Sequence, residues 1–421
     1  MHRQLAALLV VVSLAPAACS AGSAPPELAA AAVPRASADP SAAAAAASAV
    51  DAFGFDLYRR LAAPGRNVVV SPTSVVLALA MARLGARGET ASQMDAVLHA
   101  TGLDQAAALN ALDAALAARS GTFPDVTGHQ VEVALRIANA PFAQRDEHWA
   151  SAFLEALAAR FGAGVRLVDY RADPEAARRA IDAWVADRTE GRIPELLGAG
   201  ALDALTRLVL VDAIYLTAPW AMPFVPGETA DAPFRRADGS TVQVPTMRAT
   251  RQLAYAAGDG WQAVELAYAG GSLAMTLVVP DDLAGFERTL DGARFAAIVA
   301  ALGPREVQLA LPRFGTETQV DLAAALGAMG MPRAFDPARA DFGGMTADER
   351  LSISKVIHQA NIDVDERGTE ASAATAVALE AMGTPAEPVR VAADRPFLFA
   401  VRDVPTGAIL FLGRIGDPSA R

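Results

Sequence analysis

The first residues of this sequence that could do chemistry are a serine, an aspartate and a histidine. Ser71, Asp212 and His358 follow one another in the order that the catalytic triad of α/β-hydrolases uses. In those enzymes the serine lies in a G-x-S-x-G turn, and the N–H of the next residue binds the oxyanion. Ser71 is not in such a turn, and it is followed by Pro72, which has no N–H. Asp212 lies inside the apolar run LVLVDAIYL and not in a loop. The sequence therefore favours a buried polar cluster that satisfies its own hydrogen bonds, with a hydrolase as the least favoured hypothesis.

Other kinds of chemistry have less support. His99, His129 and His148 show no metal-ligand spacing, and no glycine loop for a nucleotide phosphate is present. We therefore expect no metal and no cofactor. The net charge of −11 is not offset by any basic block, which argues against a nucleic-acid partner. The helical stretch LDQAAALNALDAALAARSG has no basic cluster either, so we expect no binding of glycosaminoglycans.

The N-terminus has the pattern of an export signal. Arg3 precedes the apolar run LAALLVVVSLA, which is too short to span a bilayer, and small residues follow. We predict a signal peptide over residues 1–19 and an exported protein, either secreted or periplasmic. Cys19, the only cysteine, suggests lipidation, but Pro16 stands where such signals usually have Leu, so ordinary cleavage competes. A lipid anchor is the only membrane contact that we expect. Residues 20–47 are rich in Ala, Pro and Ser and are predicted to be a disordered tether.

The elements that would position the polar residues can be outlined from periodicity. The run AVDAFGFDLYRRLAA predicts a helix, and Ser71 and Pro72 are a good cap and first residue for a second, buried helix that ends at Gly85. The run LVLVDAIYL predicts a central strand that is covered on both faces. From about residue 230 short β-rich runs follow, and the last two, RPFLFAVRD and AILFLGRI, predict a hairpin. Helices early and strands late indicate the α+β class.

Several separated motifs give the chain a family resemblance. They are NVVVSPTSVVLALAMARLGARGETASQM, ISKVIHQANIDVDERGTEASAATA and DRPFLFAVRDVPTGAILFLGRIGDP. In this order they resemble the signatures of the serpins, a family of serine protease inhibitors, and the likeness covers residues 48–418. The resemblance implies one serpin domain over that range, with helices mainly in its N-terminal half around three β-sheets, and an exposed reactive-centre loop. With the leader, it suggests a bacterial-type exported member that is not an enzyme and acts as a monomer.

The resemblance assigns the polar cluster a place beneath the centre of the main sheet. Ser71, Ser74, Asp212 and His358 fall on the serpin "shutter". Asp212 stands where the family usually has Asn. We hypothesise that a histidine–carboxylate pair replaces the usual neutral hydrogen bond and makes opening of the sheet more dependent on pH.

The family mechanism also assigns a role to the helix-prone stretch GTEASAATAVALEAMG. Serpins offer this loop to a protease as bait and, after attack, insert it into the main sheet. The hinge residues would be Glu366, Gly368, Thr369, Glu370, Ala371, Ser372, Ala373 and Ala374. Side chains alternate between the two faces of a strand, and the face led by Thr369 holds only small to apolar residues, so the loop could enter the sheet.

The family's spacing places the bait residue at Met382, with the scissile bond before Gly383. A Met suits elastase-, chymotrypsin- or subtilisin-like serine proteases, which would be bound as a covalent acyl-enzyme. The alternative is a non-inhibitory serpin, a binding or storage protein whose loop never inserts.

Overall fold

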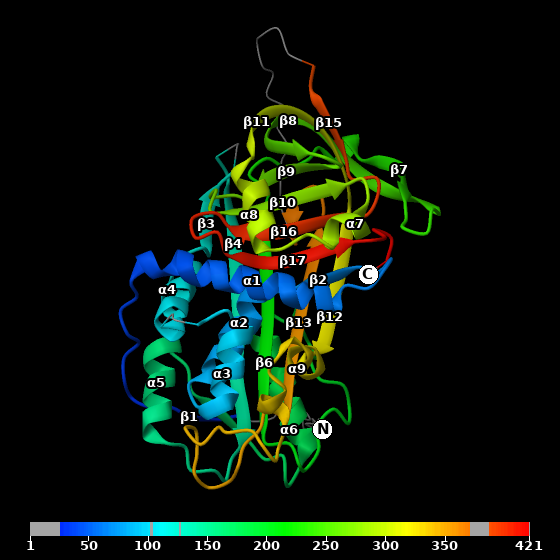
Figure 1. Ribbon diagram of the computed structural model, residues 1–421. Helices are drawn as coiled ribbons and strands as arrows, with labels where there is room; N and C mark the ends of the chain where they lie inside the picture. Colours follow the sequence, from blue (N-terminus) through cyan, green and yellow to red (C-terminus); the bar gives the residue numbers. More distant parts are fainter. Residues whose placement is uncertain (1–25, 102–103, 126–127, 371–386, 421) are drawn as a thin grey trace, which may run out of the picture.

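The computed structural model describes residues 26–101, 104–125, 128–370 and 387–420, and its centre is a sheet of eight strands (Figure 1). The long strands run side by side, with β4 and β6 antiparallel and β6 and β13 parallel. The strand order is β1 (Glu27–Ala29), β5 (Val165–Val168), β4 (Gln130–Gln144), β6 (Leu208–Pro219), β14 (Gly368–Thr369), β13 (Lys355–Val364) and β12 (Phe314–Asp321), and β3 (Gly121–Pro124) pairs with β4. We call this the main sheet.

A second sheet of nine strands lies above it in Figure 1. The last two strands of the chain, β16 and β17, belong to this sheet and form the predicted hairpin. The resemblance implies three β-sheets, and here the strands outside the main sheet share the long strand β8, which pairs with β7 and β11 along most of its length and with β9 at its end. The strand order is β15 (Val389–Ala392), β11 (Gly303–Pro312), β8 (Thr241–Gly258), β9 (Trp261–Ala267), β10 (Leu273–Pro280), β16 (Phe397–Asp403), β17 (Ile409–Ile415) and β2 (Val68–Val70), and β7 (Ala230–Arg235) pairs with β8.

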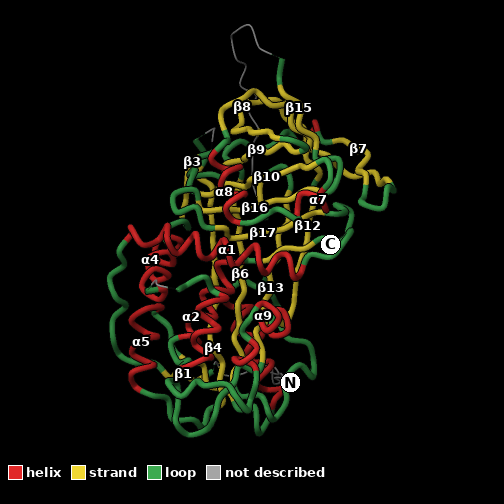
Figure 2. Tube along the Cα trace, viewed as in Figure 1, coloured by secondary structure: helices red, strands yellow, loops and turns green. Residues whose placement is uncertain are grey.

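Most helices come from the first half of the chain, as the α+β prediction requires, and Figure 2 shows them gathered beside the long strands. None of the helices in the described ranges is long and apolar enough to cross a membrane. The helices are α1 (Ala43–Leu61), α2 (Pro72–Arg83), α3 (Gly88–Val97), α4 (Gln105–Ala117), α5 (Ser151–Phe161), α6 (Pro174–Arg188), α7 (Leu283–Glu287), α8 (Gly292–Ala300) and α9 (Ala323–Met329), with short 3₁₀ turns at Pro40–Ala42, Pro226–Glu228 and Pro332–Phe335.

Strand β6 is buried on both faces, as its apolar run predicts. Its even-numbered residues, among them Leu210 and Ile214, belong to the large core that contains the buried side of α2. Its odd-numbered residues, among them Val211 and Ala213, belong to a smaller core beneath α6. Because side chains alternate along a strand, Asp212 must face α2. The sheet therefore separates two apolar layers, and the polar cluster lies in the layer of α2.

The segment 20–47 differs from the disordered tether that its composition predicts, at least from residue 26 onward. Strand β1 pairs antiparallel with β5 at the edge of the main sheet. Arg35 then donates to the side chain of Asn110 at 2.7 Å and to Asp113 at 2.6 Å, both on α4. Helix α1 begins at Ala43. The backbone of Ala36 donates to the carbonyl of Ala159 at 2.7 Å and accepts from Asn110 Nδ2 at 3.0 Å. These interactions depend on the rest of the fold and leave no trace in local composition.

Candidate functional site

The four predicted shutter residues lie together in the structure. Ser71 is the N-cap of α2 and Ser74 lies in its first turn, as the sequence predicts. Asp212 and His358 are direct neighbours across the parallel pair of β6 and β13. All four side chains are fully buried. The cluster therefore joins the start of α2 to the two central strands of the main sheet.

The hydrogen bonds of the cluster do not form a catalytic triad. His358 Nε2 accepts a hydrogen bond from the backbone N–H of Ser71 at 3.2 Å, and His358 Nδ1 contacts Asp212 Oδ1. The hydroxyl oxygen of Ser71 accepts from the backbone N–H of Ser74 at 3.2 Å, so it serves as a helix cap. A nucleophile must be hydrogen-bonded to its base and must be reachable by substrate, and Ser71 is neither. The hydrolase hypothesis is therefore wrong.

The protonation of the histidine follows from these contacts. Because Nε2 accepts a hydrogen bond, the ring proton of a neutral His358 is on Nδ1, which donates it to Asp212. Burial raises the pKa of Asp212 above its ordinary value of 3.8, and the contacts with His358 and with the nearby Ser74 hydroxyl only partly oppose this rise. The second oxygen of the carboxyl group, Oδ2, is buried and has no hydrogen-bond partner. Asp212 is thus an incompletely satisfied buried acid.

A fifth residue completes the cluster and was not predicted. The hydroxyl of Ser74 donates to Asn139 Oδ1 at 2.8 Å, and Asn139 Nδ2 donates to the backbone carbonyl of Ser74 at 3.0 Å. Asn139 lies on β4, directly opposite Asp212. A signal was present in the sequence, because an amide inside the run VALRIANAPFA is unusual for a strand with two neighbours. The cluster therefore spans three strands as well as α2.

The hinge begins as a short strand in the main sheet. Strand β14 lies between β6 and β13, and Thr369 pairs with Ala218 on one side and with Val364 on the other. Gly368 has φ 151°, and a Cβ there would lie 2.2 Å from the carbonyl oxygen of Ala218. Only glycine fits this close approach. Gly368 therefore fixes the position at which the chain enters the main sheet between β6 and β13.

Buried contacts hold both ends of this entry. Thr369 is hydrogen-bonded to the hydroxyl of Tyr268 at 2.7 Å, and Tyr268 stacks on Trp220 with ring centroids 4.5 Å apart. The side chain of Glu370 makes an ion pair with Arg192, with an N–O distance of 3.3 Å. The side chain of Thr369 thus points into the core, and that of Glu370 points to the loop after α6.

Glu366 anchors the turn before the hinge. Burial alone would raise its pKa, but hydrogen bonds from Arg313, at 2.9 Å, and from Thr229 lower the pKa below its ordinary value. Glu366 is therefore a buried anion with two donors, and its backbone carbonyl also accepts from the N–H of Phe224 at 2.8 Å. The turn is fixed before the chain reaches Gly368.

The remaining predicted sites fall outside the described residues. These are Ala371, Ser372, Ala373 and Ala374 of the hinge, the bait pair Met382 and Gly383, and Cys19. In the ranges that the structure does describe, no group of three or more His, Cys, Asp or Glu side chains is placed to hold a metal ion.

Comparisons with known proteins match the chain almost throughout. The family model described as "Serpin (serine protease inhibitor)" matches residues 48–418. A leukocyte elastase inhibitor of Bos taurus is 36% identical over 386 residues, which cover 88% of this chain and 99% of that protein. An uncharacterised serpin-like protein of Thermococcus kodakarensis is 37% identical over 378 residues, covering 88% of this chain and 85% of the other.

Solved structures show the same fold. The thermophilic serpin tengpin in its native state superposes with a TM-score of 0.78 at 26% identity, covering 91% of this chain and 96% of that one. Maspin superposes with a TM-score of 0.79 at 22% identity, over 90% of this chain and 100% of its own.

Proposed function

This chain belongs to the serpin family, and from that premise we propose that it inhibits serine proteases by suicide-substrate trapping. The serine hydroxyl of the protease attacks the carbonyl carbon of Met382, the bond to Gly383 breaks, and the amine of Gly383 leaves. The new N-terminal part of the loop, which still carries the protease as an ester, then enters the main sheet. There it distorts the bound protease before water can release it.

The observation that carries this proposal is the position of β14. It starts a strand between β6 and β13, and below it these two strands pair directly with each other across six residue pairs, from Lys355–Val209 to Ala360–Ile214. A strand that continues β14 downward would separate this parallel ladder and pair antiparallel with both neighbours. One parallel ladder would be exchanged for two antiparallel ladders, and antiparallel pairing is slightly more stable per residue. This exchange supplies a driving force for insertion.

The composition of the hinge supports insertion as well. Thr369 faces the core at Tyr268, so in a strand that continued β14 alternation would give Ala371 and Ala373 the same face. Both side chains are small, and neither would bring a charge into the apolar layer. Glu370 and Ser372 would take the opposite face. The loop thus carries no residue near its start that would stop its entry.

The bait residue supports a class of target. The pocket that binds a Met side chain must be apolar and of medium size, as in elastase-, chymotrypsin- and subtilisin-like proteases. Several relatives, including the one from Bos taurus, carry the name leukocyte elastase inhibitor. The spacing from Gly368 gives Met382 and Gly383 as the cleaved pair.

The test is a covalent complex. The protein is mixed with elastase, chymotrypsin or subtilisin, and a band that resists denaturation at the summed mass is sought on a gel. Ala371→Arg should abolish the complex and leave a cleaved substrate, because it would bury a charge on insertion. The matched variant Ser372→Arg should keep the complex. Cleavage near Met382 without any complex in the wild type would refute inhibition and leave a non-inhibitory serpin.

We also propose that the protein is exported as a monomer, of the kind found in bacteria. The leader over residues 1–19 supports export, and Cys19 supports a lipid anchor. Mass spectrometry of the protein from an expressing bacterium tests both. A diacylglycerol adduct that disappears in Cys19→Ala indicates a lipoprotein, cleavage without an adduct indicates secretion, and an intact N-terminus would overturn the proposal.

A further inference from the structure

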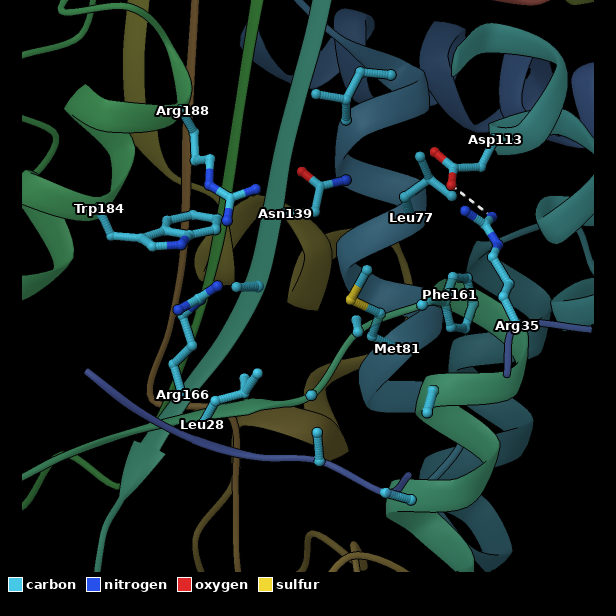
Figure 3. A pocket seen from close by; sticks show the side chains of 18 of the residues that line it. Leu28, Arg35, Leu77, Met81, Asp113, Asn139, Phe161, Arg166, Trp184 and Arg188 are labelled. Carbon is cyan, nitrogen blue, oxygen red and sulfur yellow. Dashed lines mark hydrogen bonds and ion pairs between the residues drawn. The ribbon is translucent and has the colours of Figure 1, made fainter. Parts of the chain in front are cut away.

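A cavity of about 430 Å³ lies at the edge of the main sheet, beside the shutter (Figure 3). Its walls come from α2, α4, β4, α5, the start of β5, α6 and the segment 28–35, which includes the end of β1. Strand β4 passes through the middle. Figure 3 shows Trp184, Arg166 and Arg188 on one side of β4, and Leu77, Met81 and Phe161 on the other. A volume of this size is within the range of natural small-molecule sites, about 300–1,000 Å³.

One end of the cavity is cationic. The guanidinium group of Arg166 lies 4.7 Å from the ring centroid of Trp184, and that of Arg188 lies 5.7 Å from it. Among the described residues no carboxylate is within ion-pairing distance of Arg166, and the only one near Arg188 is its exposed neighbour Asp187, at 3.7 Å. Burial and the nearby charge of Arg188 both lower the pKa of Arg166. Arg166 therefore has no compensating anion among the described residues, and Arg188 has only the exposed Asp187.

An unused hydrogen-bond donor lies at the same place. The side chain of Trp184 is only 9% exposed, and its Nε1–H is buried without a partner. Buried polar groups are nearly always hydrogen-bonded, because an unpaired one loses its interactions with water and gains none. An anionic acceptor from outside the chain would satisfy this donor and would balance the charge of Arg166.

The other end of the cavity is lined by apolar side chains, Leu77 and Met81 of α2, Ile137 of β4 and Phe161 of α5. The charges there, those of Arg35 and of Asp113 on α4, are paired with each other at 2.6 Å (Figure 3). We propose that the cavity binds a small amphipathic carboxylate, with the carboxylate at Arg166, Arg188 and Trp184 and an alkyl chain along the apolar end. The ligand class is a medium-chain fatty carboxylate.

Such a ligand would also touch the shutter. Asn139 lines the cavity and holds Ser74 of the polar cluster through two hydrogen bonds. A molecule wedged between α2 and β4 favours the spacing of these elements in which it binds best. We infer that it slows insertion of the loop. This second effect depends on the proposed inhibitory function, whereas binding itself does not.

Titration calorimetry on the full chain tests binding, with decanoate as the probe. Hexanoate should bind at least tenfold more weakly, because fewer methylene groups are buried. Decyltrimethylammonium, with the same chain and the opposite charge, should not bind. Arg166→Gln should weaken decanoate at least tenfold, and the control Arg179→Gln, an exposed arginine on α6, should change it less than twofold.

Fluorescence supplies an independent readout. Decanoate should change the emission of the wild type, and most of that change should be lost in Trp184→Phe. Equal binding of decanoate and the cationic probe, or unchanged affinity in a folded Arg166→Gln, would overturn the site. If decanoate binds normally but the rate of covalent complex formation with a protease is unchanged, only the proposed effect on insertion is overturned. If the protein forms no covalent complex with or without decanoate, the proposed inhibitory function is overturned, and the ligand site is not.

Discussion

Replacing Asp212 by asparagine should stabilise the protein at neutral pH and make its stability less dependent on pH. In the wild type, Oδ2 of this carboxyl group is buried without a partner. The Ser74 hydroxyl lies close enough to the carboxyl group to affect its pKa, but it has a single hydrogen, which it donates to Asn139 Oδ1 at 2.8 Å. An amide at position 212 would keep the oxygen that accepts from His358. It would also offer an N–H to the free lone pairs of the Ser74 hydroxyl, so that every member of the cluster would be satisfied.

The magnitude follows from the orphaned atom. A buried polar group without a partner costs about 1–3 kcal/mol, and Asp212→Asn removes that cost. The sign of the pH dependence follows from the raised pKa of Asp212. The folded protein holds this proton more tightly than the unfolded chain does, so the free energy of unfolding falls as the pH rises from the ordinary value of 3.8 through the folded pKa. Asparagine has no such titration.

The difference between the two proteins should therefore be small near pH 4 and largest at pH 8. Thermal and urea-induced unfolding of wild type and Asp212→Asn at pH 5, 6, 7 and 8 measure it. Burial also raises the pKa of Asp51, to about 7, but this residue is the same in both proteins and cancels in the comparison. Asp187→Asn is the matched control, because it removes the same charge from a side chain that is 80% exposed, and its profile should follow the wild type.

Two results would refute the reasoning. Parallel profiles of wild type and Asp212→Asn from pH 5 to 8 would show that the carboxyl group does not titrate in this range. A variant that is less stable than the wild type at pH 8 would show that the carboxylate is better satisfied than the contacts of the cluster indicate.

Three further substitutions test the fold around the site. Gly368→Ala forces a Cβ against the backbone of β6 and should lower the free energy of unfolding by about 1–3 kcal/mol or more. Gly407 also has a positive φ, but a Cβ there has no atom within 4 Å, so Gly407→Ala should cost less. Equal losses in the two variants would contradict the close approach at Gly368. Tyr268→Phe leaves the hydroxyl of Thr369 without its buried partner and should cost about 1–2 kcal/mol in urea denaturation, with no change disproving the contact. Arg35→Ala removes the bonds of its side chain to α4 and should cost about 1–3 kcal/mol, with faster proteolysis of the N-terminal segment. Unchanged proteolysis would show that β1 and the backbone bonds of Ala36 hold the segment without the arginine.

The sequence predicted those parts of the site that depend on local signals. The Ser71–Pro72 pair is a helix start in almost any context, and the unbroken apolar run around Asp212 predicts a strand covered on both faces. Local signals could not predict the cluster itself, because nothing in the sequence around either residue brings His358 beside Asp212. That contact was predicted from family resemblance, which carries information about the whole fold.

The missed features depend on register and on edges. Asn139 joins the cluster because β4 pairs with β6 in the register that sets it opposite Asp212, and register is fixed by the whole sheet. The fixed conformation of residues 26–42 arises from one short strand at a sheet edge, from Arg35 and from the backbone bonds of Ala36. A composition rich in Ala and Pro predicts little burial, which is correct for this segment, but it does not predict whether a free edge is available to pair with it.

The place of β14 also sets a limit on chain length. If the register of Thr369 with Ala218 continued down β6, Leu379 would lie opposite Leu208, at the far end of that strand. An uncut chain would then have the ten steps from Leu379 to Val389 to return to β15, at most about 36 Å, whereas the climb from Leu208 to Ala218 alone takes about 33 Å and β15 lies well above the top of β6 (Figure 1). Full insertion thus requires either a cut in the loop or the detachment of β15 from β11. After a cut at Met382 the attached protease would travel the whole length of β6, from the top of the sheet to its opposite end.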